Sequence, residues 1–449
     1  MIRQRVLEKW VFAVALFVSY GASASMADQA HRAEAAGIDL VTYPTSVKDV
    51  VVILGALPAG DAMAVPGGNI AIPTLAGMML DRGTKARDKF AIADQLDNVG
   101  AEISYAVGTQ GLEIRAKCLK KDLPLVVGLI AAELRTPALQ AQEFAKAKQQ
   151  FIGSLKASLQ NTGGRAQEAF GRAVFPEGHP NRPRPVAEYI AAAGAATLDD
   201  LKAFIAKYYG PAHLTLVMVG DVSPSISSAE VAKAFSGWTG GQDYLRPAQP
   251  AVTAGPRDIT VPLSGKPSVT VLLGQATGLK YRDPDALALR VGTAVLGHGF
   301  TGRLMGAVRD KEGLTYSIWA GMMDDSIADG KWAISASFAP ALLDKGIVST
   351  RRELEKWWSA GITDAELSDR KLGLVGGYFV GLATTSGVAN TLLTSIQRGY
   401  DLSWLDTYPQ AIEALTRAQV NSSIKTHLNP DTMVLVEAGS VGSAAPKSN

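Results

Sequence analysis

Apolar residues in this chain gather in short runs, which alternate with longer stretches where they recur every three or four positions. Residues 50–54 and 214–219 are runs of valine and other large apolar side chains, which predicts central β-strands. Residues 363–375 show helical spacing, and this helix is predicted to begin after Thr363, with Glu366 completing a capping box. We therefore expect an α+β fold in which helices pack on one face of a mainly antiparallel sheet.

The two halves of the chain repeat each other. Matching segments occur in the same order in both halves: residues 51–55 with 270–274, residues 144–153 and 159–164 with 367–376 and 382–387, and residues 196–220 with 415–439. The offset is the same for the first and last pairs (270 − 51 = 415 − 196) and slightly larger for the middle pairs (367 − 144), which a small insertion explains. A period close to half the chain predicts two homologous domains, each in the order strand, helix, strands, helices, strand, and not a solenoid of short repeats.

A segment rich in glycine and proline, residues 237–257, separates the two repeats. Such a composition is typical of an extended linker. We therefore predict an N-terminal domain over residues 28–236 and a C-terminal domain over residues 258–449, joined so that they can close on a substrate.

The N-terminus has the layout of a secretory signal peptide. Three basic residues precede the apolar run at residues 10–18, and small residues follow at 22–24. Cleavage is expected after Ala24 or Ala27, so residues 1–27 are interpreted as a signal peptide that is removed on export. A retained membrane anchor is the alternative, but the apolar run is shorter than the roughly 20 residues that a spanning helix needs.

The composition argues against several classes of protein. The 449 residues, 47% of them hydrophobic, are enough for at least two domains with large cores. The 44 basic and 42 acidic residues are well mixed, so we expect no nucleic-acid partner and no binding to an anionic membrane. The single cysteine, Cys118, cannot form an internal disulfide, and its expected role is that of a small buried hydrophobe.

The candidate chemistry lies at one predicted helix-to-strand corner. A short helix over residues 304–311 is expected to end at Gly313 and to lead into a strand over residues 314–319, so that Arg309 and Tyr316 flank the corner. An arginine can donate a fork of hydrogen bonds to substrate carbonyls, and a tyrosine hydroxyl can donate to an oxyanion. In the alternative interpretation Arg309 merely ends a helix, where a cation suits the dipole, and Tyr316 packs in a strand.

Residues 295–321 resemble the C-domain signature of the M16 family, the insulinase-like or pitrilysin-type zinc peptidases and processing proteases, and in particular its M16B members. In that family the arginine and the tyrosine at these places hold the substrate backbone opposite the metal, which implies this role for Arg309 and Tyr316. The resemblance covers nearly the whole chain after the signal peptide, and it implies a fold like that of LuxS and the mitochondrial processing peptidase. The glycine-rich loop at 297–302 is similar to one that some non-catalytic members use against substrate, although a tight turn is an equal alternative.

The zinc motif of the family, His-x-x-Glu-His, occurs nowhere in the sequence. Aligned through a shared Gly-Thr ending, Thr74 and Met78 stand at the places of the two histidines and Gly77 at the place of the catalytic glutamate. Zinc catalysis also needs a distant carboxylate, which would fall at residues 153–155, where there is no acidic residue. We therefore expect no metal in this chain and an ordinary core helix at residues 74–81. The five histidines show no metal-ligand spacing and are expected to be surface or capping residues.

In heterodimeric members of the family one subunit holds the zinc and the other contributes the arginine and tyrosine. The resemblance therefore implies that this chain is the non-catalytic, substrate-binding subunit of a periplasmic zinc peptidase, inactive alone, with zinc expected in a homologous partner subunit. Peptide substrates are expected to bind by adding a strand to a sheet edge.

Three other hypotheses stay open at this stage. The chain could be a peptide-binding or scaffolding protein that has lost proteolysis, or a lone metallopeptidase with unusual ligands. Residues 422–425 also fit the Ser-x-x-Lys motif of penicillin-recognising enzymes, but Lys-Thr-Gly is missing and the repeat places the motif in an ordinary helix.

Overall fold

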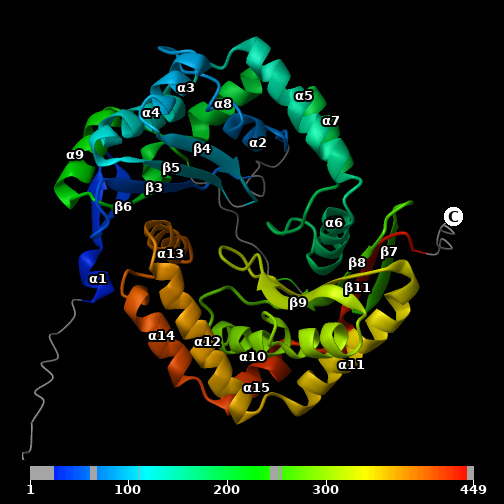
Figure 1. The fold of residues 1–449 in the computed structure, drawn as a ribbon. Helices are drawn as coiled ribbons and strands as arrows, with labels where there is room; N and C mark the ends of the chain where they lie inside the picture. The colour runs from blue at the N-terminus through cyan, green and yellow to red at the C-terminus, as the bar shows by residue number, and fades with distance from the viewer. Residues whose placement is uncertain (1–24, 61–67, 110, 243–250, 252–254, 442–449) are drawn as a thin grey trace, which may run out of the picture.

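A computed structural model describes residues 25–60, 68–109, 111–242, 251 and 255–441. Most of the predicted signal peptide and much of the predicted linker lie outside these residues. The described residues form two sheets, one in each half of the chain (Figure 1). The mixed α+β fold with two similar domains is confirmed.

The N-terminal half is built from six strands and nine helices of the described residues. The strands are β1 (His31–Ala35), β2 (Ile38–Pro44), β3 (Val50–Leu57), β4 (Glu102–Val107), β5 (Leu112–Leu119) and β6 (Thr215–Gly220). The helices are α1 (Met26–Gln29), α2 (Ile72–Gly77), α3 (Lys89–Asp97), α4 (Leu123–Arg135), α5 (Ala141–Ser158), α6 (Thr162–Val174), α7 (Val186–Ala195), α8 (Leu198–Tyr208) and α9 (Pro224–Ala234).

The C-terminal half repeats this arrangement. Its strands are β7 (Arg257–Pro262), β8 (Val269–Ala276), β9 (Thr315–Met323), β10 (Lys331–Phe338) and β11 (Val434–Gly439). Its helices are α10 (Ala286–Gly297), the π-helix η4 (Met305–Lys311), α11 (Leu343–Ala360), α12 (Asp364–Leu382), α13 (Thr385–Gln397), α14 (Trp404–Ala414) and α15 (Arg417–His427).

Within the described residues the two sheets have the same topology, apart from the additional edge strand β1 of the first sheet. The strand order is β1-β2-β6-β3-β5-β4 in the first and β7-β11-β8-β10-β9 in the second. The starts of β3 and β8, at positions 50 and 269, are separated by the offset that the sequence repeat predicts, and so are the starts of α6 and α13, at positions 162 and 385. Neighbouring strands are antiparallel except for the parallel pairs β2·β6 and β7·β11. At the N-terminus of α12, Thr363 and Glu366 form the predicted capping box.

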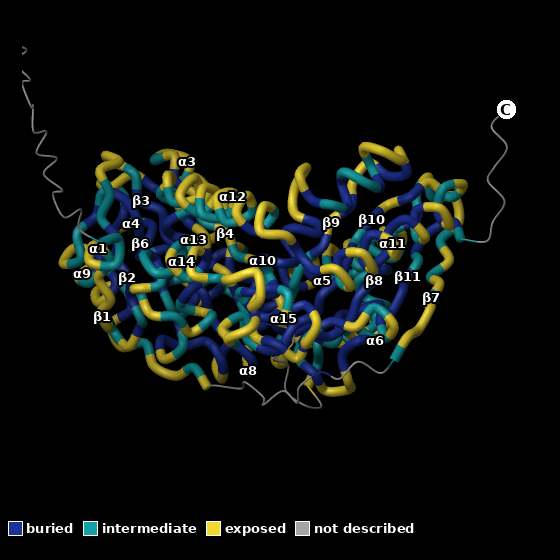
Figure 2. Tube along the Cα trace, turned by 90° about the horizontal axis from the view of Figure 1, so that it is seen from below, coloured by how far each residue is buried: buried dark blue, intermediate teal, exposed yellow. Residues whose placement is uncertain are grey.

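The strands are apolar on both faces because each sheet lies between two layers of helix. On β3, Ile53 belongs to a core shared with helices of its own half, whereas Val52 and Leu54 belong to a core shared with α13. This explains why residues 50–54 form a continuous apolar run instead of an alternating one. Figure 2 shows the resulting buried segments running through both halves.

The second face of each sheet is covered by a helix from the opposite half. Helix α13 of the C-terminal half packs on β3 and β6, and helix α6 of the N-terminal half packs on β8 and β11 (Figure 1). Phe170 of α6 is completely buried against the C-terminal sheet. The prediction that helices pack on one face of each sheet is therefore incomplete. The sequence of one repeat does not reveal that a helix of the other repeat covers the second face.

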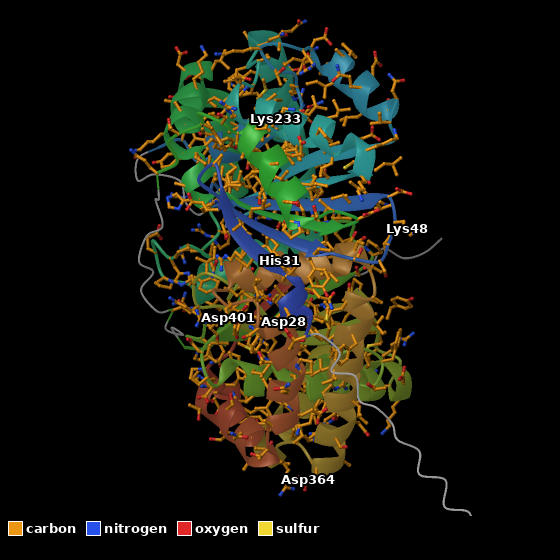
Figure 3. All side chains as sticks on the ribbon, turned by 90° about the vertical axis from the view of Figure 1, so that its left-hand side faces the viewer. Asp28, His31, Lys48, Lys233, Asp364 and Asp401 are labelled. Carbon is orange, nitrogen blue, oxygen red and sulfur yellow. The ribbon has the colours of Figure 1, made fainter. Side chains whose placement is uncertain are left out.

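The surface is of mixed charge, as the composition predicts. On the side of the molecule shown in Figure 3, Lys48 and Lys233 lie on the N-terminal half and Asp364 and Asp401 on the C-terminal half. Within the described residues no single helix is long and apolar enough to span a membrane. Helices α12 and α13 together have the required length and apolar composition, but the chain bends by 112° between them. Cys118 is buried, as predicted, and burial raises the pKa of its thiol to about 12.

Replacing Phe170 tests whether α6 holds the two halves together. Phe170→Ala should lower the free energy of unfolding by about 3–5 kcal/mol, because it leaves a cavity between a helix of one half and the sheet of the other. Denaturation in guanidinium chloride measures the change, and Phe90→Ala, at a position 70% exposed, serves as the control. Equal stability of the two variants would contradict the structural role of this contact.

Glu133 makes stability depend on pH. It is buried in α4, and this burial raises the pKa of its carboxyl to about 7, although the Tyr105 hydroxyl donates a hydrogen bond to it. Because the folded state binds the proton more tightly than the unfolded chain, this stabilisation is complete below about pH 4 and is lost as the pH rises through 7.

Glu133→Gln should remove that loss, which amounts to at most about 3 kcal/mol. Above pH 7 the variant should be more stable than the unaltered chain, and its stability should fall less between pH 4.5 and pH 8. Urea denaturation across this range measures the effect, with the exposed Glu113→Gln as a control. Parallel pH profiles for all three proteins would show that Glu133 does not carry the dependence.

Candidate functional site

The predicted helix-to-strand corner is present, and it contains a π-helix. Arg309 lies in η4, and the N–H of Gly313 donates to its carbonyl oxygen at 2.9 Å. Gly313 has a φ of +63°, the left-handed conformation predicted for the residue that ends this helix. Tyr316 then lies near the start of β9, which is the outermost strand of its sheet and is longer than predicted. A π-helix widens one turn, and such turns are frequent at functional sites.

The guanidinium of Arg309 lies near the rings of both Tyr316 and Phe300. The guanidinium carbon of Arg309 is 5.3 Å from the ring centroid of Tyr316 and 5.3 Å from that of Phe300, which is within the range of cation–π attraction. Tyr316 is 85% exposed and Phe300 75% exposed. The ion pair of Arg309 with Asp310 is long, at 3.6 Å, and 29% of the Arg309 side chain is exposed, so the guanidinium is only weakly paired.

A role for Phe300 was not predicted from the sequence. It lies within the glycine-rich loop at 297–302, and the signal that could have identified it is a large aromatic residue among glycines. Gly297 allows this loop to approach β9, because a Cβ at that position would lie 2.3 Å from the backbone nitrogen of Ala320. Arg370 of α12 donates to the carbonyl of His298 and thereby holds the loop from the other side.

An ion pair fixes the start of η4 to α12. The guanidinium of Arg303 donates two hydrogen bonds of 2.7 Å to the carboxylate of Glu366. These bonds lower the pKa of Glu366 to about 2, so the pair stays ionised at neutral pH. Glu366 therefore both caps α12 and anchors the segment that carries Arg309.

The positions aligned with the zinc motif do not fit a zinc ion. Thr74 and Met78 are half-buried on and just after α2, and neither offers an imidazole. A Cβ on the buried Gly77 would lie 2.3 Å from Cγ2 of Val107 on β4, so the place of the catalytic glutamate is filled by a neighbouring side chain. Residues 153–155 carry no carboxylate, and no cluster of three potential metal ligands occurs within the described residues.

Comparison with known proteins connects this geometry to a family. Residues 195–374, which include Arg309 and Tyr316, match the family model described as the peptidase M16 inactive domain. Over these residues the chain is similar to the M16 inactive domain. The region around Thr74, Gly77 and Met78 lies outside the matched segment.

Two curated relatives illustrate the range of the M16 homologues. An uncharacterized zinc protease of Streptomyces coelicolor is 27% identical over 322 residues, which cover 70% of this chain and 69% of that protein. The non-peptidase homolog YmxG of Helicobacter pylori is 23% identical over 378 residues, which cover 82% and 84% of the two chains. The relatives thus include proteins described as proteases and one described as a non-peptidase.

Solved structures share the fold. A peptidase M16 inactive domain from Pseudomonas fluorescens superposes with a TM-score of 0.83 at 24% identity, covering 93% of this chain and 99% of that chain. The periplasmic protease PqqL from Escherichia coli superposes with a TM-score of 0.74 at 16% identity, covering 97% of this chain and 49% of that one. The M16 fold is therefore present over nearly the whole described chain.

Gly77→Ala tests the packing at the position that aligns with the catalytic glutamate of the zinc motif. Alanine favours a helix by about 0.5–1 kcal/mol over glycine. Contact with Val107 should nevertheless produce a net loss of about 1–2 kcal/mol in the free energy of unfolding.

The Val107→Ala background provides the matched control for this change. There Gly77→Ala should be neutral or stabilising, because the opposing methyl group has been removed. A double-mutant cycle by chemical denaturation measures the coupling between the two positions. A cycle without coupling would mean that position 77 has space for a side chain.

Proposed function

We propose that this chain is the non-catalytic, substrate-binding subunit of a heterodimeric, periplasmic M16-type zinc peptidase. Arg309 and Tyr316 complete a cavity that also contains the zinc site of a homologous partner subunit. The zinc belongs to the partner, where it supplies the metal-activated water. This chain binds and orients the peptide.

The observation that carries the proposal is the contrast between the two ends of the site. Thr74 and Met78 are half-buried and Gly77 is packed against Val107, whereas Tyr316 is exposed on the outer strand β9 and the half-buried Arg309 of η4 lies beside it. A tyrosine that only stabilised the fold would not need to be 85% exposed at a sheet edge beside an arginine.

The residues have distinct tasks in this proposal. An extended peptide pairs with the outer edge of β9 through main-chain hydrogen bonds. The guanidinium of Arg309, which lies near the rings of Phe300 and Tyr316, donates its fork of N–H groups to peptide carbonyls. The hydroxyl of Tyr316 donates to the oxyanion that forms when water attacks the peptide bond.

Export of the chain is part of the proposal. Cleavage after Ala24 would leave Ser25, whose side chain caps α1, and the backbone N–H groups of Met26 and Ala27, which donate to the carboxylate of Asp406 at 2.9 Å. Residues 25–27 therefore belong to the folded part, which favours the earlier of the two predicted cleavage points. Recovery of uncleaved chain from the cytoplasm alone would contradict export.

The test compares peptide hydrolysis by this chain, by a purified zinc-bearing M16 homologue from the same cell, and by their mixture. The chain alone should be inactive, and the mixture should exceed the partner. In the mixture, Arg309→Ala and Tyr316→Phe should each lower kcat/KM by about 10²-fold, the magnitude typical of a lost oxyanion donor. Arg417→Ala, an exposed arginine on α15, is the matched control. A mixture no faster than the partner, or unchanged rates in both variants, would overturn the proposal.

A second candidate is a peptide-binding protein that has lost proteolysis, favoured by the description of one relative as a non-peptidase homolog. It predicts that peptides bind and that Arg309→Ala weakens this binding. It also predicts that no partner hydrolyses peptides faster in the presence of this chain.

A further inference from the structure

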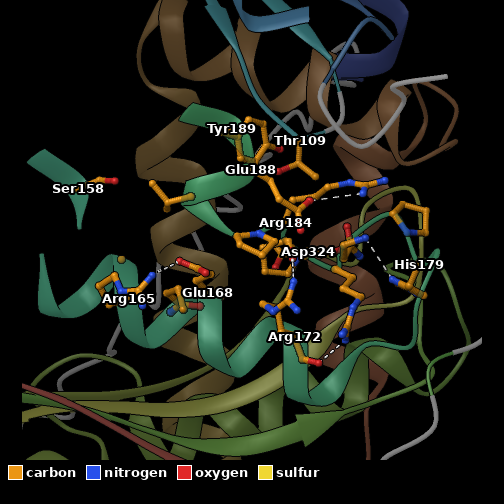
Figure 4. Close-up of a pocket in the computed structure, with 18 of the residues that line it drawn as sticks. Thr109, Ser158, Arg165, Glu168, Arg172, His179, Arg184, Glu188, Tyr189 and Asp324 are labelled. Carbon is orange, nitrogen blue, oxygen red and sulfur yellow. Dashed lines mark hydrogen bonds and ion pairs between the residues drawn. The ribbon is translucent and has the colours of Figure 1, made fainter. Parts of the chain in front are cut away.

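A cavity of about 500 Å³ lies between the two halves, away from the helix-to-strand corner (Figure 4). Its walls come from α5, α6, α7 and the connection between α6 and α7, together with Asp324 and Lys331 of the C-terminal half. Phe151 and Leu155 of α5 supply apolar surface. The volume lies within the range of small-ligand sites.

The cavity is preformed because the connection between α6 and α7 is fixed to the opposite half. His179 is buried, its ring stacks on Phe175 with centroids 4.5 Å apart, and its Nε2 lies 3.0 Å from the carboxylate of Asp329. Nδ1 of His179 accepts the N–H of Asn181, so Nε2 carries the proton that is donated to Asp329. The expectation that every histidine is a surface or capping residue was therefore wrong for His179, which docks one half onto the other.

Asn181 completes this attachment. Its side-chain N–H group donates to the carbonyl oxygens of Asp324 and Asp329, at 2.7 and 3.0 Å. The turn between β9 and β10 is thus held by side chains from the N-terminal half. The cavity wall has the rigidity that a binding site requires.

The charges around the cavity do not balance. Its lining contains five cationic side chains and four carboxylates, and each carboxylate pairs with a different cation. The pairs are Arg165 with Glu168 at 2.6 Å, Arg182 with Glu177 at 3.2 Å, Arg184 with Glu188 at 3.6 Å and Lys331 with Asp324 at 2.9 Å. Arg172 is left without a carboxylate partner among the described residues.

Two guanidinium groups retain donors for a ligand. Arg172 is half-buried, and its side chain makes one long hydrogen bond, 3.4 Å to the carbonyl of Pro183. Arg184 is 3.6 Å from Glu188, which is beyond hydrogen-bond distance. A partly buried guanidinium that lacks an acidic partner in its own chain can bind a ligand carboxylate. The strongest arrangement is bidentate, with two parallel N–H···O hydrogen bonds.

We propose that this cavity binds the carboxyl terminus of a peptide. Arg172 forms the bidentate contact and Arg184 adds a second charge, while Phe151 and Leu155 contact the last side chains of the peptide. The inference rests on the proposed peptide-binding function, but the cavity is a second contact that does not involve Arg309 or Tyr316.

The test measures fluorescence anisotropy of a fluorescein-labelled hexa-alanine peptide bound to the mature chain without a partner. The peptide with a free carboxyl end should bind at least tenfold more tightly than its carboxamide twin, and salt should reduce the difference. Arg172→Gln and Arg172→Ala should both bring the ratio of the two Kd values close to one. Arg184→Ala should lower it, and Arg417→Ala should leave it unchanged. Thermal unfolding identifies any variant that fails to fold.

Three outcomes would overturn the assignment. The first is equal binding of acid and amide, and the second is an acid preference that survives in folded Arg172→Gln. The third is that a hexapeptide amide ending in glutamate binds as tightly as hexa-alanine with a free carboxyl end. The site would then bind any carboxylate, and it would not be specific for the carboxyl terminus.

Arg309→Ala separates this inference from the proposed function. It should abolish the gain in hydrolysis by the mixture and leave the acid-to-amide ratio unchanged. One outcome is that Arg172→Gln brings the ratio of the two Kd values to one while Arg309→Ala has no effect on hydrolysis. This outcome would support carboxyl-terminus binding in the cavity and reject the proposed role of Arg309. The reverse pattern would reject the cavity alone.

Discussion

The exchange of helices α6 and α13 between the halves is the contact on which the rest of the molecule depends. Each sheet has two apolar faces, and its own half supplies helices for only one of them. Burying the second face is strongly favourable, and in this chain the covering helix must come from the other half. The relative position of the two sheets is therefore set by core packing. The positions of the helix-to-strand corner and of the cavity between the halves depend on this fixed arrangement of the two sheets.

This arrangement argues against the expectation that a flexible linker lets the two domains close on a substrate. Residues 237–257 are rich in glycine and proline, but the buried contacts of α6 and α13 with the opposite sheets fix the relative position of the halves. Any closing motion that separated the sheets would have to withdraw α6 or α13 from a buried surface. The docking of His179 onto Asp329 adds a further constraint between the halves. Large hinge motion within one chain is therefore costly.

The sequence predicted the parts of the structure that depend on local pattern. Apolar runs identified β3 and β6, and the repeat identified their counterparts. A glycine after a short helix was enough to bring Arg309 and Tyr316 together. The exchange of helices could not be predicted, because the apolar face of α6 would look the same against either sheet. Phe300 was missed because exposure of an aromatic side chain depends on where the loop lies. The cavity was missed because residues far apart in the sequence, from both halves, form it.

The helix exchange also bears on how such a chain could arise by duplication. A protein with a single copy of the repeat would have α6, or its counterpart, extending from the domain with no sheet of its own chain to cover. Two identical copies could satisfy each other reciprocally around a twofold axis, with the same surface used by both. Fusion of two such genes would retain that contact within one polypeptide. One copy could then lose its metal ligands while the other kept the residues that bind substrate, with no change in the shared core.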